Sequence, residues 1–264
     1  MDGKEKNNSL GEGAKSALLN EGETWGEFFR SIFYAFLIAI SVRTFILQPF
    51  SIPSESMLKN LMVGDFLLVN KMSYGYSKHS LPFSLPIIPD RIFSDDVERG
   101  DVVVFRLPRD PDIYYIKRIV GVPGDKIQMI NGELHLNGAK LPRIQIEDYV
   151  RTNEYGREER FEQFEEVMPS GKTYVTLNRE YVRRADDTQV FIVPEGHYFA
   201  MGDHRDNSLD SRWPSSEGVG FVPFENIIGK ATWLTLSFDN HSALWEFWKW
   251  FPEERRDRFF TTIN

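Results

Sequence analysis

Three segments of this sequence carry polar residues that could together make or break an acyl bond. Ser54 and Ser56 lie two residues apart, directly after Pro53. Lys117 lies inside an apolar run, and the polar segment GDHRDNSLDSR occupies residues 202–212. A serine hydroxyl becomes a nucleophile when a base removes its proton. A lysine amine can be that base if burial lowers its pKa from about 10.4 towards 7.

Few side chains could serve as this base. The chain has no cysteine and five histidines, of which only His204 lies in one of the polar segments. Each segment by itself is typical of an ordinary turn or a solvent-facing strand. Lys117, however, is flanked by Ile116 and Ile119, which predict its burial. We therefore expect Lys117, rather than His204, to activate Ser56.

Composition excludes several other classes of protein. The chain has 264 residues and a formal net charge of −8, whereas a nucleic-acid binder needs a basic face. Without cysteine there are no disulfides, thiol nucleophiles or thiolate metal sites. We expect no metal, no organic cofactor and no nucleic acid. Eight acids and three arginines fall within residues 147–166. We interpret this acidic stretch as a solvated loop, within an insertion at about 143–180, rather than as an acidic binding site.

The elements that position these residues begin with an apolar segment near the N-terminus. Residues 28–47 contain only two charges, Arg30 and Arg43. A helix of this length spans about 30 Å, the thickness of the hydrocarbon core of a bilayer. We predict a cytoplasmic tail at 1–27, a transmembrane helix at 28–48 and export of everything that follows. The alternatives are a buried core helix and, less favoured, a cleaved signal peptide.

After residue 60 the pattern is that of short β-strands. Asn131-Gly132 and Asn137-Gly138 are typical of hairpin turns, because both turn positions tolerate positive φ. We predict a mainly antiparallel β domain over residues 49–240. The last segment, 241–264, is aromatic and then basic, and either rests on lipid headgroups or packs as a terminal helix.

The order of these motifs resembles that of the bacterial type I signal peptidases, which are membrane-anchored Ser/Lys proteases. The resemblance runs from about Trp25 to Asp239. It implies an antiparallel β fold of signal-peptidase type with one N-terminal transmembrane helix. The five ordered segments that carry it are Ser54-Glu55-Ser56-Met57, Gly64-Asp65, RGDVVVF at 99–105, Lys117-Arg118 with GVPGD at 121–125, and GDHRDNSLDSR at 202–212.

The resemblance also implies a role for each motif residue. Ser56 is the expected nucleophile and Lys117 its general base. Ser54 would donate its hydroxyl, together with the Ser56 backbone N–H, to the oxyanion. Ser208 would hydrogen-bond the Lys117 amine. The implied supporting ion-pair residues are Asp203, Asp210 and Arg212. The implied shallow apolar pockets are lined by Phe50, Ile52, Met57, Leu61, Tyr115 and Ile116.

The same resemblance implies the substrates and the setting. They are exported preproteins, cut after small residues at −1 and −3 by a monomer in the bacterial inner membrane, with its catalytic domain on the periplasmic side. The sequence departs from the usual family pattern at three sites, which comprise four residues. Glu55 replaces a glycine, Lys59-Asn60 replaces Pro-Thr, and His204 replaces an asparagine.

Three other hypotheses fit parts of the sequence. A hydrolase with a Ser-His-Asp triad would use His204 with Asp203 or Asp206. Adjacent residues do not readily form an aligned pair, however, and Lys117 would have no role. A self-cleaving relative of the LexA-type repressors would need a DNA-binding head in place of the apolar segment. A membrane-tethered β module without activity would leave the three polar segments unexplained.

Overall fold

A computed structural model describes residues 25–81, 84, 87–153, 155–179, 183–238 and 253–263. The N-terminal tail and the aromatic stretch at 243–251 lie outside the described residues, so what we expect of them stays a prediction. The chain divides into two compact units, residues 1–42 and 43–264, which are described separately.

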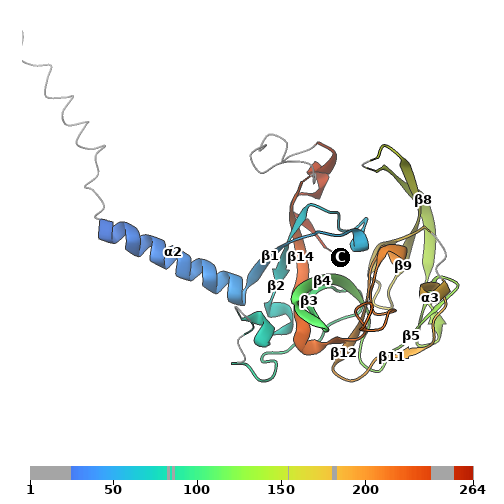
Figure 1. Ribbon diagram of the computed structural model, residues 1–264, viewed down its shortest axis with the longest axis horizontal. Helices are drawn as coiled ribbons and strands as arrows, with labels where there is room; N and C mark the ends of the chain where they lie inside the picture. Colours follow the sequence, from blue (N-terminus) through green and yellow to red (C-terminus); the bar gives the residue numbers. More distant parts are fainter. Residues whose placement is uncertain are drawn as a thin grey trace, which may run out of the picture. The chain divides into compact units, whose positions relative to one another are not determined.

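The first unit contains most of a long apolar helix, α2 (Trp25–Phe45; Figure 1). By length and composition, its 21 residues are sufficient to cross a membrane. Large apolar side chains such as Phe29 and Ile38 are exposed along it, which suits a lipid environment better than water. The helix begins and ends three residues earlier than the predicted 28–48. It stops because Leu47–Ser51, which includes Pro49, forms a strand instead.

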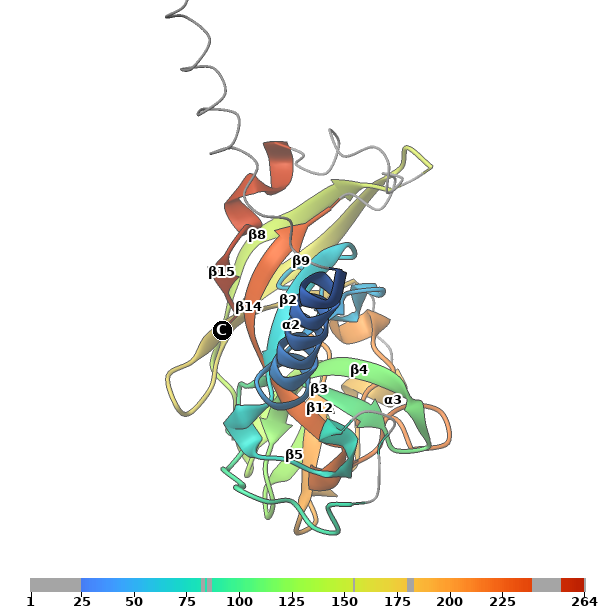
Figure 2. The same ribbon diagram turned by 90° about the vertical axis from the view of Figure 1, so that its left-hand side faces the viewer.

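The second unit is built around an eight-stranded antiparallel sheet (Figure 2). Its strands pair in the order β1-β2-β14-β3-β4-β12-β13, and β15 pairs with β14. In chain order they are β1 (Leu47–Ser51), β2 (Asp65–Asn70), β3 (Val102–Leu107), β4 (Asp110–Gly121), β12 (His197–Met201), β13 (Val222–Pro223), β14 (Ile227–Ser237) and β15 (Thr261–Thr262).

Strand β3 shows how this sheet buries apolar residues on both faces. Side chains alternate along a strand, so Val102 and Val104 pack in one core cluster while Val103 and Phe105 pack in another. All six residues of β3 are buried. The neighbouring strand β4 places Lys117 opposite Val103, in the interior of the domain.

A second, four-stranded sheet contains the two predicted hairpins. Its order is β11-β5-β6-β7. Asn131-Gly132 connects β5 to β6 and Asn137-Gly138 connects β6 to β7, with positive φ at all four residues. Both hairpin predictions are confirmed. The strands are β5 (Lys126–Ile130), β6 (Glu133–Leu136), β7 (Ala139–Lys140) and β11 (Phe191–Ile192).

The acidic stretch forms a third sheet, which corrects our expectation of a solvated loop. The order is β10-β9-β8, with β8 at Arg143–Thr152, β9 at Glu158–Val167 and β10 at Thr173–Asn178. Along β9 exposed Glu158 and Glu162 are interspersed with buried Phe161 and Phe164. Acids occur on both faces of this strand, and Phe161 builds a small core with Leu58 and Leu177.

Short helical turns and the C-terminal residues complete the domain. Residues 253–263 return to the main sheet, where β15 pairs with β14 and Ile263 packs against the core. The predicted mainly antiparallel β fold with one N-terminal apolar helix is therefore confirmed. The remaining helical elements are η1 (Glu55–Met57), η2 (Met72–Tyr74), η3 (Lys78–Ser80), α3 (Arg183–Asp186), η5 (Arg205–Asn207), η6 (Phe224–Asn226) and η8 (Glu253–Arg258).

A buried ion pair ties the third sheet to the polar segment at 202–212. Glu166 on β9 accepts two hydrogen bonds from the guanidinium of Arg205, at 2.8 and 2.5 Å. Both side chains are 1% exposed, and the Tyr174 hydroxyl donates to Glu166 at 2.8 Å. An ion pair at this depth holds its two elements together because separating them would leave a charge buried alone.

We expect Glu166→Gln to lower the free energy of unfolding by about 3–5 kcal/mol, because Arg205 would remain buried without a carboxylate. Urea denaturation of the full chain in detergent micelles, followed by tryptophan fluorescence, measures this change. The double variant Glu166→Leu with Arg205→Met removes both charges and should be closer to the wild type. An equal loss in the single and double variants would contradict this account.

Candidate active site

Ser56 lies in the short 3-10 turn η1, which several backbone hydrogen bonds hold in place. Leu58 N–H donates to the Glu55 carbonyl at 3.0 Å, and His204 N–H donates to the Ser56 carbonyl at 3.1 Å. Met57, the last residue of the turn, has no exposed surface and packs in the hydrophobic core. The Ser56 side chain is 7% exposed, so it is held in a nearly closed position.

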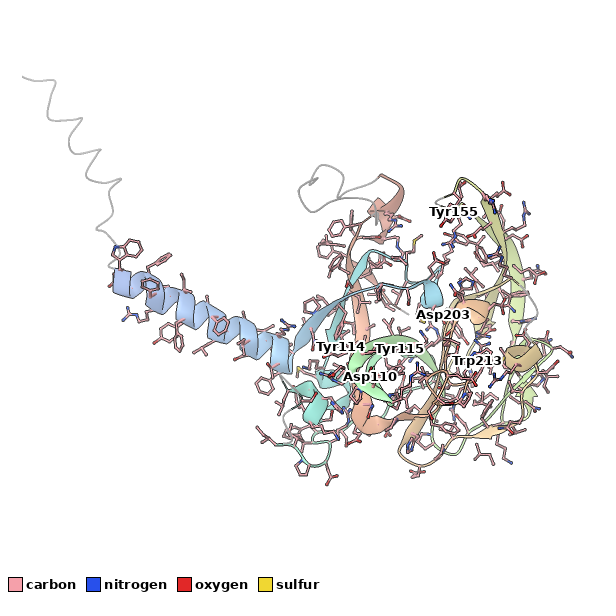
Figure 3. The ribbon with its side chains drawn as sticks, viewed as in Figure 1. Asp110, Tyr114, Tyr115, Tyr155, Asp203 and Trp213 are labelled. Carbon is pink, nitrogen blue, oxygen red and sulfur yellow. The ribbon has the colours of Figure 1, made fainter. Side chains whose placement is uncertain are left out.

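Lys117 reaches this serine from β4. Its Nζ lies 2.5 Å from Ser56 Oγ and 2.9 Å from the Ile116 carbonyl oxygen. The amine also lies 5.2 Å from the centre of the ring of Tyr115, which is labelled in Figure 3. Lys117 is 3% exposed. The fold thus brings together two residues that are 61 positions apart in the chain.

The charge state of Lys117 follows from its surroundings. Burial, with a smaller contribution from Arg212, lowers the pKa of its amine to about 8, against the attraction of Asp210 and Asp203. Both carboxylates are already paired. Asp203 receives two hydrogen bonds of 2.9 Å from Arg118, and Asp210 receives two of 2.9 Å from Arg212. A substantial neutral fraction of the amine can therefore accept a proton near neutral pH.

Asp210 also fixes the backbone beside Ser56. Burial alone would raise its pKa, but the charge and hydrogen bonds of Arg212 lower it, so Asp210 stays ionised. Its carboxylate accepts a hydrogen bond from Gly202 N–H at 2.9 Å. Asp203 and Asp210 are thus each paired with a buried arginine, Arg118 and Arg212 respectively.

Ser208 is buried near Ser56, but its predicted hydrogen bond to Lys117 is not formed. The amine instead contacts Ser56 and the Ile116 carbonyl, while a hydrogen bond from the Ser208 hydroxyl helps to lower the pKa of Asp210. Ser208 packs so closely on Gly202 that a side chain at 202 would collide with it. Ser54 lies on the exposed side, with its Oγ 3.4 Å from Ser56 Oγ.

The six predicted pocket residues divide between two core clusters. Five belong to or pack against one cluster, whereas Tyr115 packs on the other, because consecutive residues of β4 face opposite sides. Met57 and Leu61 have no exposed surface. In this structure these two side chains belong to the buried core next to Ser56 and do not line an open pocket. The five residues of the first cluster are Phe50, Ile52, Met57, Leu61 and Ile116.

The environment of His204 argues against a Ser-His-Asp triad. Its Nδ1 lies 3.3 Å from the Glu55 carbonyl oxygen, and its ring packs edge-on against Phe161 at 5.2 Å. Burial lowers the pKa of its imidazole. Asp203, the neighbouring candidate partner, is paired with Arg118. The ring thus packs between η1 and the third sheet.

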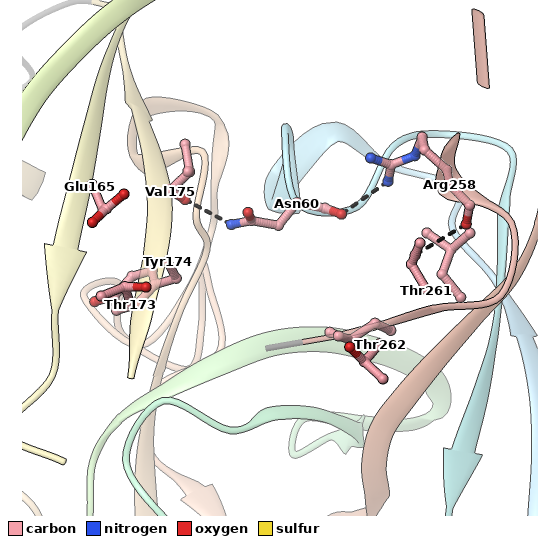
Figure 4. A pocket seen from close by; sticks show the side chains of 10 residues that line it. Asn60, Glu165, Thr173, Tyr174, Val175, Arg258, Thr261 and Thr262 are labelled. Atoms are coloured by element: carbon pink, nitrogen blue, oxygen red, sulfur yellow. Dashed lines mark hydrogen bonds between the residues drawn. The ribbon is translucent and has the colours of Figure 1, made fainter. Parts of the chain in front are cut away.

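Sequence reasoning missed Asn60 as a supporting residue. Its amide donates to Asp203 Oδ2 and to the Val175 carbonyl, both at 2.7 Å. Figure 4 shows Asn60 between β10 and the C-terminal residues, where it lines a cavity of about 240 Å³. The departure from the family pattern at positions 59–60 was the available signal, but the partners lie more than 100 residues away in the chain.

Comparison with known proteins shows extensive similarity. Residues 25–236 match the family described as "Signal peptidase, peptidase S26". The chain is 40% identical over 226 residues to signal peptidase I of Rickettsia canadensis, which covers 83% of this chain and 82% of that protein. It is 41% identical over 223 residues to that of Rickettsia felis, covering 81% and 79%. A solved signal peptidase I from Enterococcus faecalis V583 is 26% identical, covers 52% of this chain and 98% of that one, and has a TM-score of 0.32.

We expect Gly202→Ala to displace the η1 turn that carries Ser56, because the added Cβ would lie 2.5 Å from the Ser56 carbonyl oxygen. Overpacking of this kind costs about 1–3 kcal/mol of stability. A shift of Ser56 by about 1 Å would slow any reaction that depends on it by about a hundredfold. Thermal unfolding and a Ser56-dependent assay measure the two effects.

Gly171→Ala is the matched control for this variant. Gly171 has a φ of 83° and nothing within 4 Å of an added Cβ, so alanine there strains only an exposed turn. It should reduce stability slightly and leave the Ser56-dependent rate unchanged. A Gly202→Ala variant that behaves like this control would contradict the close packing around Ser56.

Proposed function

This chain belongs to the signal peptidase family, peptidase S26, and from that premise we propose that Ser56 and Lys117 form the catalytic dyad with which it removes signal peptides. Membership makes the chain a serine endopeptidase. The observation that carries the assignment of the dyad is the 2.5 Å contact between Ser56 Oγ and Lys117 Nζ, two buried groups. A nucleophile within hydrogen-bond distance of a base is the geometry that this chemistry needs.

The proposed mechanism begins with the neutral Lys117 amine. It takes the proton from Ser56 Oγ as that oxygen attacks the scissile carbonyl carbon. The Ser56 N–H and the Ser54 hydroxyl would stabilise the oxyanion that forms. The protonated amine then gives its proton to the leaving amine, and the peptide bond breaks to leave an acyl ester on Ser56. Water, deprotonated by the same amine, hydrolyses the ester and restores both residues.

The pairing of β4 supports an extended substrate. Residues 114–117 pair with β3 on one side, whereas β12 pairs with β4 only at Arg118, Ile119 and Gly121. Within the described sheet, the other edge of β4 beside Lys117 is therefore open to a strand of substrate. We propose that the signal peptide binds along this edge, and that the apolar residues around Ile52 and Ile116 accept only small side chains at −1 and −3.

The proposed setting is the bacterial inner membrane. The family is membrane-anchored, and α2 is the apolar helix that would span the bilayer. We propose that residues 1–27 are cytoplasmic and that the domain from about residue 49 acts on the periplasmic side, as a monomer at the lipid surface. Preproteins crossing the membrane would present their cleavage regions to it there. Membership in an enzyme family removes the case for an inactive β module and for a repressor.

Cleavage of one preprotein with an Ala-x-Ala site, reconstituted in lipid vesicles, tests the dyad. Ser56→Ala and Lys117→Ala should each lower kcat at least about a thousandfold, because each removes a group that acts in the chemical step. His204→Phe removes the imidazole but keeps an aromatic ring against Phe161, and should stay within about threefold of the wild type. A dead histidine variant beside an active lysine variant would show that the dyad is misassigned.

The lysine base also predicts how the rate depends on pH. The folded pKa of about 8 lies below the ordinary value of 10.5, so the reactive neutral form is lost as the pH falls through 8. The single-turnover rate should rise about tenfold per pH unit up to pH 8 and then level off. Circular dichroism at each pH checks that the fold persists. A flat profile between pH 5 and 9 would exclude a lysine base.

A further inference from the structure

The hairpin of the acidic stretch makes direct contact with the turn that carries the nucleophile. Arg151, near the end of β8, donates from both terminal guanidinium nitrogens to the two carboxylate oxygens of Glu55, at 2.6 and 2.9 Å. Glu55 is the residue immediately before Ser56. Beyond Arg151 the hairpin ends in an exposed tip at Tyr155 (Figure 3), so the contact with Glu55 is made next to the tip.

Arg151 is held from its other side as well. Its Nε donates to Glu159 on β9 at 2.9 Å, and its guanidinium lies 5.5 Å from the centre of the Phe161 ring. The hydrogen bonds to Glu55, and then those to Glu159, raise its pKa. Isolated surface ion pairs contribute little, but a bidentate pair within a network is fixed in position. Arg151 and Glu55 side chains are 25% and 33% exposed, so this pair is partly shielded.

The three residues after the η1 turn also contact the third sheet. Leu58 packs with Phe161 and Leu177 in a small core. The Lys59 amine lies 5.3 Å from the centre of the Tyr149 ring, and Asn60 bonds the Val175 carbonyl. All three departures from the family pattern therefore point to one surface, since Glu55, Lys59-Asn60 and His204 each contact β8, β9 or β10.

We propose that Arg151 is a positioning residue for Ser56, acting through Glu55, and that the third sheet is the support against which the nucleophile turn is set. This inference rests on the proposed function. Glu55 and Ser56 share one 3-10 turn of three residues, so fixing the Glu55 side chain limits the rotation of the turn. That limit keeps Ser56 Oγ within reach of Lys117 Nζ, where small displacements are costly.

The test compares variants of two arginines on the same hairpin. Arg151→Met keeps the apolar stem but removes the charge, and should lower kcat about tenfold with KM changed less than about twofold. Arg151→Lys keeps a charge without the bidentate geometry and should recover part of the loss. Arg160→Met is the matched control. Arg160 is 64% exposed with ion pairs of only 3.5 and 3.6 Å, and its variant should stay near the wild type.

A double-mutant cycle separates positioning from a general loss of stability. Glu55→Gln should lower kcat about as much as Arg151→Met, and the two together should cause no further loss, because they break one interaction. Additive losses, a change in KM alone, or equal rates for the Arg151 and Arg160 variants would each overturn the proposal. If Arg151→Met fails to fold, Arg151→Lys and Glu55→Gln still decide it.

Wild type and Ser56→Ala in the same assay distinguish the two levels of inference. A Ser56→Ala variant as active as the wild type would overturn the proposed function, and the positioning role with it. An inactive Ser56→Ala variant beside a fully active Arg151→Met variant would overturn only the positioning role.

Discussion

The site depends on one buried amine, that of Lys117, which has no carboxylate of its own. Three arginines lie buried around the nucleophile, and each is matched to an acid: Arg118 to Asp203, Arg205 to Glu166 and Arg212 to Asp210. Lys117 contacts a hydroxyl and a carbonyl instead. Because the nearby carboxylates are committed elsewhere, burial prevails and lowers the pKa of the amine. A carboxylate directly paired with Lys117 would keep it protonated and useless as a base.

The same pairing of charges makes the site rigid. The site is assembled from three distant parts of the chain: the η1 turn that carries Ser56, strand β4 and the segment 202–212. These parts are joined by backbone hydrogen bonds and buried ion pairs. The Ser56 carbonyl accepts from His204 N–H, and Gly202 N–H donates to Asp210. Gly202 leaves no room for a side chain between Ser56 and Ser208. Such a site is set before substrate arrives, which is what the proposed dyad requires.

The acidic stretch forms most of strands β8 and β9 of the third sheet, which packs against the segment that follows Ser56. Glu147, Glu158 and Glu162 face solvent. Phe161 and Leu177 pack against Leu58, and the Val175 carbonyl accepts from Asn60, both in the segment that follows Ser56. The open edge of β4 lies on the main sheet. In the proposed function the main sheet would therefore bind substrate, while the third sheet supports the turn that carries Ser56. Buried ion pairs such as Glu166–Arg205 hold the third sheet in place.

The sequence by itself determined the features that depend on neighbouring residues. Apolar residues beside Lys117 predicted its burial, Asn-Gly pairs predicted the hairpins, and a long apolar run predicted the helix, because each effect acts within a few positions. Tertiary structure alone decided which charges meet. Glu55 and Arg151 are 96 positions apart and Glu166 and Arg205 are 39 apart, and nothing local encodes such pairs. The sequence predicts a loop at the acidic strand because β9 has five acids and only two aromatic residues. The expected bond from Ser208 to Lys117 is absent, since the amine contacts Ser56 and the Ile116 carbonyl. Residue types and their neighbours therefore predicted Ser56 and Lys117 as the reacting groups. The tertiary structure decided which charged residues surround them.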